Sequence, residues 1–396
     1  MPRRTTTSAN GGYRAVSAVL FLCLFAAQAG AIALSPVLVE VARDLDVSTT
    51  SAGQLRTIAG LVAGVTALAL PRVGGRIGLR RQLLGGAMLL ALGSLTSAAA
   101  PSLTLLAAAQ VPVGVGIATL TTAGTLAAAA WVPPERRTTV LSWALVGQPA
   151  AWIVGQPLIG FVAGGSWRYA WLVLPLSAAL LAGAAVGSRR GEQPSSMLPR
   201  HLRAALAAPG LGRWLTAELL ANTAWAGTLV YAGALFVESY GTSTELTGAV
   251  LAIGAGAYVA GNLALRRFVL RDAGRLLVGL AVALAVTTAL FGASRPSVVV
   301  STALFSVAAF AAEGRTFISS VFGLAARPEV RAGAMAMRAA SMQFGYFAGS
   351  FVAGAALVLG GYPALGSALG LLFAAAAAAI GRRQHDPATA PVTSSC

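Results

Sequence analysis

One face of the apolar segment at residues 213–239 carries side chains that could bind a small molecule and a proton. This stripe consists of Glu218, Asn222, Trp225 and Thr228. Intervals of three and four residues place these side chains on one face of an α-helix. Polar side chains inside a membrane helix are costly unless they are satisfied or face a cavity. The combination of an acid, an amide and an indole favours a functional site over a purely structural one.

Other apolar segments repeat this pattern with amides and aromatic rings. For each amide the alternative role is a hydrogen bond between helices, which stabilises a membrane bundle without contacting substrate. The further stripes are Gln28 in the first segment, then Gln148, Trp152 and Gln156, then Tyr258 and Asn262, and finally Arg338, Met342 and Tyr346.

Two acids lie deep enough in the spans to act in proton coupling. A coupling acid needs an environment that makes its protonation respond to burial and to substrate. Glu218 is the first candidate and Glu313 the second. We expect Arg338 to be the partner of Glu313, because Arg315 is two residues away on the same helix and points to another face. Near the outer ends of spans, Glu40 and Glu238 are expected to be hydrated helix caps.

The composition identifies an integral membrane protein. Of the 396 residues, 57% are apolar and 10% are charged, and the mean hydropathy is +0.76. A soluble domain carries about a quarter charged residues. All lysine-or-arginine positions are arginine, and they give the chain a net charge of +16. Most of these arginines lie in short loops, where they set the orientation in the membrane rather than bind nucleic acid. The two cysteines and two histidines form no metal-ligand pattern, so we expect no metal and no cofactor.

Twelve apolar segments are long enough to cross a membrane. A cytoplasmic N-terminus places most arginines in cytoplasmic loops, as the positive-inside rule requires. We therefore expect a multi-pass protein of a bacterial plasma membrane with both termini in the cytoplasm. The expected spans are 14–42, 51–70, 82–100, 103–131, 139–164, 168–188, 213–239, 245–265, 275–293, 297–322, 331–359 and 363–381.

Repeated motifs divide these spans into two sets of six. Pro134-Glu135-Arg136-Arg137 returns as Pro328-Glu329-Val330-Arg331, and Ser48-Thr49 with Gly53 returns as Ser243-Thr244 with Gly248. Six spans bring the chain back to its starting side, so the halves are parallel repeats related by an axis along the membrane normal. We expect six-helix bundles at 13–188 and 213–383, a cytoplasmic linker at 189–212, and disordered tails at 1–12 and 384–396.

The loop after the second span carries a family signature. Arg76, Gly78, Arg80 and Arg81 fit the pattern Gly-x-x-x-Asp-Arg-x-Gly-Arg-Arg, whereas Gly75 replaces the aspartate. In these residues and in its twelve spans the chain resembles the major facilitator superfamily. The resemblance implies an all-α fold of two parallel six-helix repeats. In that family the aspartate takes part in a charge network that latches the cytoplasmic side, which Gly75 cannot supply.

The fifth span resembles that of the drug:proton antiporter branch of this family. It is rich in Gly and Pro from Gly147 to Gly160 and is followed by Trp167-Arg168, but Gln156 separates Gly155 from Pro157. The family places such spans around a central cavity. The resemblance therefore implies a cavity lined by Gln28, Gln148, Trp152, Gln156, Asn222, Trp225, Tyr258, Asn262, Met342 and Tyr346.

We expect a secondary active transporter that exports small hydrophobic drugs or metabolites by alternating access and proton antiport. Aromatic rings, amides and few charges indicate a neutral or cationic organic substrate. The proposed partners are this substrate, protons and the lipid bilayer, with the chain acting as a monomer. The alternatives are an importer or uniporter of a nutrient and a non-transporting membrane sensor. An enzyme is disfavoured because no nucleophile and base converge in the sequence.

Overall fold

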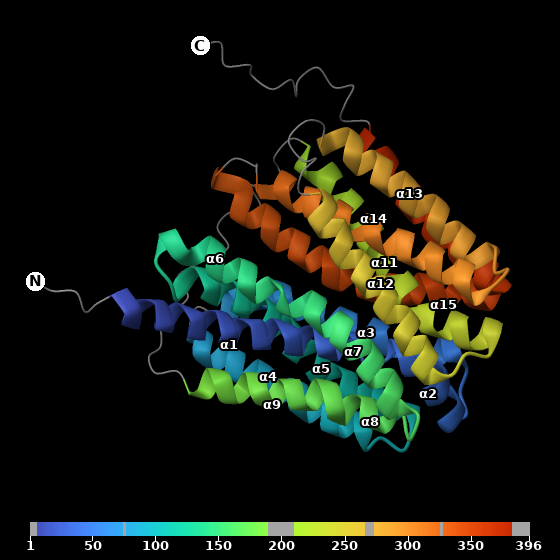
Figure 1. The fold of residues 1–396 in the computed structure, drawn as a ribbon, viewed down its shortest axis with the longest axis horizontal. Helices are drawn as coiled ribbons and strands as arrows, with labels where there is room; N and C mark the ends of the chain where they lie inside the picture. Colours follow the sequence, from blue (N-terminus) through green and yellow to red (C-terminus); the bar gives the residue numbers. More distant parts are fainter. Residues whose placement is uncertain (1–5, 74–76, 189–209, 266–272, 325–327, 382–396) are drawn as a thin grey trace, which may run out of the picture.

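The computed structural model describes residues 6–73, 77–188, 210–265, 273–324 and 328–381 (Figure 1). These segments are helical throughout their apolar stretches, because a chain in lipid must satisfy its backbone hydrogen bonds internally. The first half consists of α1 (Thr6–Ile32), η1 (Ser35–Val37), α2 (Leu38–Asp44), α3 (Thr49–Val73), α4 (Leu79–Ala98), α5 (Leu103–Ala130), α6 (Pro134–Leu145), α7 (Gly147–Ala163), α8 (Arg168–Trp171), the π-helical turn η3 (Leu172–Leu176) and α9 (Ser177–Gly187).

The second half has fewer and longer helices. Its last helix contains a sharp turn at Gly360-Gly361, where Gly361 has a φ of +65° that glycine adopts readily. This turn divides the helix into two membrane spans. The elements are α11 (Leu211–Tyr240), α12 (Thr244–Leu265), α13 (Ala273–Ala293), α14 (Val298–Leu324) and α15 (Pro328–Gly381).

The predicted fold class is confirmed. Ten described segments are long and apolar enough to cross a membrane, and one of them, Gly333–Gly381, holds the two spans on either side of the glycine turn. With α4 these segments form the expected all-α arrangement of two six-helix sets. α1 begins at Thr6, before the expected start of the first bundle at residue 13. Most of the predicted linker and the final tail lie outside the described residues.

The two halves meet along two helix pairs. Figure 1 shows α1–α9 gathered in one group and α11–α15 in the other. Across the seam α3 contacts α15, and α7 contacts α12. Glycine permits the second of these contacts, because a Cβ added at Gly160 would lie 3.0 Å from the Cα of Gly248. Small residues allow helices in lipid to approach this closely.

The repeated Ser-Thr motif joins the halves at one end of the bundle. Thr49 donates a hydrogen bond of 2.5 Å to Glu238, and Thr244 donates one of 2.5 Å to Glu40. Each half thus supplies one acid and one threonine, and each pair crosses the seam. We name these four residues the reciprocal latch, and the end of the bundle that holds them the latch end.

The reciprocal latch adds to one expectation. Glu238 is exposed, as expected of a hydrated position, and Glu40 is partly buried, but each carboxylate also accepts a hydrogen bond from the opposite half. Nearby, Ser35 donates to the Leu229 carbonyl at 2.5 Å, and Tyr231 donates to the Thr50 carbonyl at 3.4 Å. These contacts hold the halves together at the latch end.

Candidate functional site

A small pocket lies on the seam, between the first and second halves. The open space at its centre is about 10 Å³, which is near the lower limit for holding a single water molecule. Helices of both halves therefore close tightly around it in this conformation. The lining consists of Ala31, Ile32, Ser35, Arg56, Trp152, Gln156, Leu229, Val230 and Tyr346.

Arg56 places a positive charge in this pocket. Its side chain projects from α3 and is 3% exposed. The guanidinium carbon lies 4.4 Å from the ring centroid of Tyr346 on α15, a cation–π contact across the seam. Nε and Nη1 of Arg56 are buried and have no hydrogen-bond partner among the described residues. The aromatic ring stabilises the charge but leaves these N–H donors unsatisfied.

Gln156 places an unsatisfied amide in the same pocket. It is fully buried on α7, and neither its Oε1 nor its Nε2 has a hydrogen-bond partner in the described part of the chain. Trp152 lies one turn earlier on the same face of α7 and also lines the pocket. Buried polar atoms are nearly always hydrogen-bonded in folded proteins. Two such groups in one pocket therefore indicate a place for a polar ligand.

A row of stacked aromatic rings leads from the pocket into the second half. Trp152 stacks on Tyr258 across the seam, with ring centroids 6.5 Å apart and an interplanar angle of 8°. Tyr258 stacks in turn on Trp225 at 6.2 Å, and Trp225 stacks on Phe305 at 6.2 Å. Spacings of this size are typical of favourable aromatic pairs. Tyr258 is thus connected to the pocket through Trp152.

Glu313 lies at the other side of Tyr258. The Asn262 amide donates a hydrogen bond of 2.6 Å to Glu313 Oε1, and Tyr258 is hydrogen-bonded to the same carboxylate. Glu313 is partly exposed, whereas Glu218 is 1% exposed. Asn262 and Tyr258, the hydrogen-bond partners of Glu313 in the described structure, are both neutral side chains from α12.

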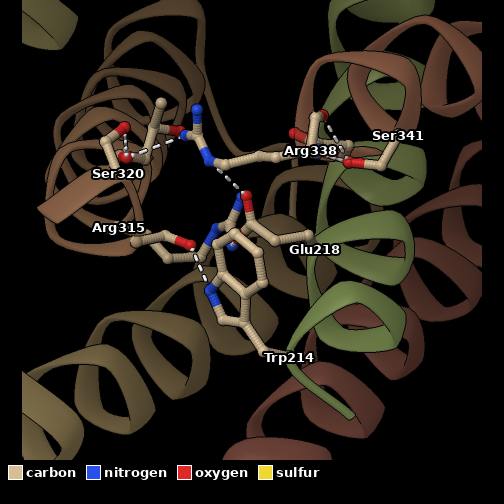
Figure 2. Close-up of polar contacts among 9 residues, drawn as sticks. Trp214, Glu218, Arg315, Ser320, Arg338 and Ser341 are labelled. Atoms are coloured by element: carbon tan, nitrogen blue, oxygen red, sulfur yellow. Dashed lines mark hydrogen bonds and ion pairs between the residues drawn. The ribbon is translucent and has the colours of Figure 1, made fainter. Parts of the chain in front are cut away.

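Glu218 lies in a separate cluster of charges inside the second half (Figure 2). Its Oε2 accepts a hydrogen bond of 2.9 Å from Arg338 Nε, and its Oε1 pairs with Arg315. Arg338 also donates to the Thr316 carbonyl at 2.9 Å, and Trp214 donates to Ser319 at 2.8 Å. These contacts link α11, α14 and α15. We name Glu218, Arg315 and Arg338 the Glu218 cluster.

This cluster shows that the expected pairing of Glu313 with Arg338 is wrong. Arg338 reaches across to α11 and pairs with Glu218 instead. Arg315 and Glu313 do point to different faces of α14, as their spacing indicates. Arg315 therefore pairs with Glu218, whereas Glu313 accepts a hydrogen bond from Asn262.

The structure brings only some of the predicted cavity residues together. Trp152, Gln156 and Tyr346 line the pocket, and Gln28 is hydrogen-bonded to Tyr346. Trp225, Tyr258 and Asn262 belong to the aromatic row and its link to Glu313. The others lie outside the pocket lining: Asn222 donates to Ser341 at 3.2 Å, and Gln148 and Met342 are partly buried elsewhere.

Arg56 is a charged residue of the pocket for which the sequence predicted no role. The sequence does contain an indication of such a role, because Arg56 is a charged residue in an apolar span and its helix, Thr49–Val73, contains no acid. An ionisable residue within a membrane span is by default a candidate for function. Arg56 belongs to no stripe of polar residues, so helical spacing did not indicate it.

The loop motif after α3 has a structural role at one position. Arg80 donates hydrogen bonds to the Val186 carbonyl at 3.4 Å and the Gly187 carbonyl at 2.8 Å, which end α9. A cation at a helix C-terminus stabilises the exposed carbonyl groups. Gly78 precedes α4, and Arg81 lies in its first turn. Arg76 falls outside the described residues.

Trp167-Arg168, the pair that follows the fifth span, anchors the loop before α8. Trp167 Nε1 donates to Asp44 at 2.9 Å, and Arg168 Nη1 pairs with the same carboxylate oxygen at 2.6 Å. Asp44 ends α2. The pair therefore ties the first span of this half to the fifth and sixth.

Comparison with solved structures supports the fold over nearly the whole chain. A D-xylose–proton symporter superposes with a TM-score of 0.75 at 16% identity, covering 93% of this chain and 97% of the symporter. The inward-open xylose transporter XylE from E. coli gives 0.74 at 15% identity, with coverage of 93% and 96%. A bacterial homologue of the human lysosomal transporter Spinster, inward-facing and occupied, gives 0.67 at 14% identity, with coverage of 93% and 94%.

Sequence comparison identifies the family. No curated protein matches the chain in sequence. A family model described as the Major Facilitator Superfamily matches residues 20–326, which is well over half of the chain. The match agrees with the twelve-span fold and with the structural similarities above. The chain therefore belongs to the Major Facilitator Superfamily of membrane transporters.

Proposed function

We propose that this transporter exports small, largely apolar organic compounds in exchange for protons. The observation that carries the proposal is the pocket on the seam, which is built from residues of both halves. A site between two parallel repeats becomes accessible from alternate sides as the halves rock against each other. Apolar and aromatic side chains form most of its lining, which suits an apolar molecule with few polar groups.

The reciprocal latch supplies a gate for this movement. In the proposed orientation the latch end faces the outside, because the arginine-rich loops then face the cytoplasm. The hydrogen bonds of Glu40 with Thr244 and of Glu238 with Thr49 close the outer side. The described conformation is then closed toward the outside, and substrate enters from the cytoplasm. Breaking both latch pairs lets the halves separate at this end and release substrate.

We assign proton coupling to Glu313 in preference to Glu218. Protonation of Glu218 would leave the buried guanidinium groups of Arg315 and Arg338 without their counter-charge, which is strongly unfavourable. Glu313 has neutral hydrogen-bond partners and is less buried than Glu218. Tyr258 connects it to Trp152 in the pocket. Occupation of the pocket then moves Trp152 and Tyr258, and with them the environment of Glu313.

Purified protein in liposomes tests this function. The assay measures accumulation of neutral, cationic and anionic aromatic compounds, with and without an imposed pH gradient, against protein-free liposomes. Antiport predicts that at least one compound accumulates in the compartment with the lower pH, and that a protonophore abolishes this. Accumulation driven by the opposite gradient indicates symport and contradicts export. The absence of protein-dependent accumulation for every compound contradicts the proposal as a whole.

A further inference from the structure

The seam pocket holds a positive charge that the described protein does not balance. Arg56 is 3% exposed, and its guanidinium stacks on the ring of Tyr346. The deep acids of the second half are engaged elsewhere, since Glu218 pairs with Arg315 and Arg338, and Glu313 is bonded by Asn262. A buried charge without a partner is unfavourable, so a site that retains one has a use for it.

The surroundings of Arg56 define the group that would balance it. Tyr346 covers the guanidinium carbon at 4.4 Å, which leaves the N–H donors at the edge of the plane. Nε and Nη1 are unpartnered, and Gln156 adds an unpartnered amide donor and acceptor in the same pocket. A planar guanidinium is suited to two parallel hydrogen bonds to a carboxylate. The amide of Gln156 could then bind the carboxylate or a neighbouring polar atom of the same molecule.

We infer that the transported compound is a small amphipathic organic acid whose carboxylate binds Arg56. The inference rests on the proposed function and names the substrate class of that site. The positive charge of Arg56 would repel a cationic compound, although the sequence analysis favoured a neutral or cationic substrate. A doubly charged phosphate would find a single cation among apolar walls formed by Ala31, Leu229 and Val230. One positive charge and a mostly apolar lining fit a singly charged acid with an apolar body.

The small open space requires the pocket to widen around such a molecule. Close contacts between α3 and α15 hold it narrow, because the Tyr346 and Phe347 backbone lies within 2.5–2.9 Å of a Cβ built at Gly60. Arg56 and Tyr346 lie on these same two helices, on opposite sides of the seam. Substrate that separates the helices therefore also separates Arg56 from the ring that covers it. The carboxylate replaces the cation–π contact as the partner of the charge.

Equilibrium binding to the full-length protein in detergent tests this inference without a pH gradient. Three probes of nearly equal size serve as ligands: phenylbutyrate, phenylbutanamide and phenylpropyltrimethylammonium. Tryptophan fluorescence and thermal stabilisation measure binding. We expect phenylbutyrate to bind wild-type protein about ten-fold or more tightly than the amide, because a site built for a charged hydrogen-bonding group rejects analogues that lack it. The ammonium compound should bind more weakly still.

Variants of Arg56 test whether this residue causes the preference for the acid over the amide. Arg56→Gln should reduce affinity for phenylbutyrate about ten-fold or more and equalise the acid and the amide. Arg56→Lys, which keeps the charge but loses the planar fork, should fall between wild type and Arg56→Gln. Arg43→Gln removes the same charge from an exposed position and should leave all three affinities unchanged.

Three results would overturn the inference. They are equal binding of acid and amide by wild-type protein, tighter binding of the ammonium compound, and binding of the acid that is unaffected in Arg56→Gln. The first two need no variant, so poor folding of a variant does not obscure them. If acid binding holds but no pH gradient drives accumulation, the proposed coupling fails and the assignment of Arg56 stands.

Discussion

The Glu218 cluster and the seam pocket both bury charge within the membrane, but they treat it in opposite ways. In the Glu218 cluster one acid is paired with Arg315 and Arg338, and all three residues belong to the second half. In the seam pocket Arg56 has no acidic partner among the described residues, and Gln156 has no hydrogen bond. The first region is satisfied within one half of the molecule. The second lies between the two halves and is unsatisfied in this conformation.

Under the proposed function, the charges of the Glu218 cluster hold the structure and the charge of Arg56 serves transport. Removal of a partner from a satisfied buried cluster exposes the remaining charges to an apolar environment and destabilises the protein. Removal of an unsatisfied polar group relieves a cost and stabilises it. Stability and transport should therefore respond in opposite senses in the two regions.

The largest effect on stability is expected at Glu218. Glu218→Gln leaves two buried guanidinium groups without their counter-charge and should reduce the free energy of unfolding by about 3–5 kcal/mol. Thermal unfolding in detergent measures this loss. Adding Arg338→Met should recover part of it, because one of the stranded charges is removed. Glu135→Gln, at an exposed position, is the control. An unchanged unfolding temperature in Glu218→Gln would show that the cluster does not hold the bundle.

The reciprocal latch should give the next largest effect, on conformation. Thr49→Val together with Thr244→Val removes two hydrogen bonds to carboxylates, each contributing about 1.5–3 kcal/mol. The closed latch end should open more often. Maleimide labelling of a cysteine introduced at Val230, which is 4% exposed, measures this in a background that lacks Cys23 and Cys396. Labelling should be several-fold faster, whereas Thr96→Val, which removes a bond within one helix, should have no effect. Equal labelling rates would argue against a gate at this end.

Gln156 should show the opposite sign from Glu218. Gln156→Leu replaces a buried amide that has no hydrogen bond with an apolar side chain of similar size, and should raise the free energy of unfolding by about 1–3 kcal/mol. The same variant should bind substrate more weakly. Thermal unfolding and the phenylbutyrate titration measure the two effects. Destabilisation by this substitution would mean that the amide has a structural partner, which would remove the contrast between the two regions.

The smallest effect is expected at Tyr258. Tyr258→Phe keeps the ring between Trp152 and Trp225 but removes the hydroxyl that is bonded to Glu313. We expect a loss of stability of about 0.5–1.5 kcal/mol and a shifted pH dependence of transport with unchanged binding of phenylbutyrate. Tyr169→Phe, on an exposed ring, is the matched control. A pH profile identical to that of wild type would break the proposed connection between the pocket and Glu313.

The fold could be predicted from the sequence because a helix that crosses the lipid needs about 20 apolar residues. The repeated Pro-Glu-x-Arg and Ser-Thr motifs indicate that the two halves are parallel repeats. The Ser-Thr motif was visible as a repeat, but its hydrogen bonds to Glu40 and Glu238 were not. Those bonds depend on which helix ends meet across the seam, and a repeat within one chain does not specify this.

The site was harder to predict because helical spacing shows which residues share a face of a helix but not which helix or cavity that face contacts. The stripe of Glu218, Asn222 and Trp225 divides among three neighbours: the charge cluster, Ser341 and the aromatic row. Arg338 was expected to pair with Glu313 because Arg315 points to another face of the same helix, whereas α15 brings Arg338 to Glu218. Arg56 belongs to no polar stripe, so helical spacing did not indicate it, and the absence of an acid on α3 leaves its charge without a partner on its own helix.

Proton-linked transport by Glu313→Gln tests the central claim most directly. Proteoliposomes containing wild type, Glu313→Gln or the exposed control Glu135→Gln are compared for gradient-driven accumulation of phenylbutyrate and for its exchange across the membrane without a gradient. The account predicts that Glu313→Gln loses gradient-driven accumulation and keeps exchange, because its amide can still accept the hydrogen bond from Asn262 but cannot exchange a proton. Gradient-driven accumulation equal to that of wild type would contradict the assignment of proton coupling to Glu313.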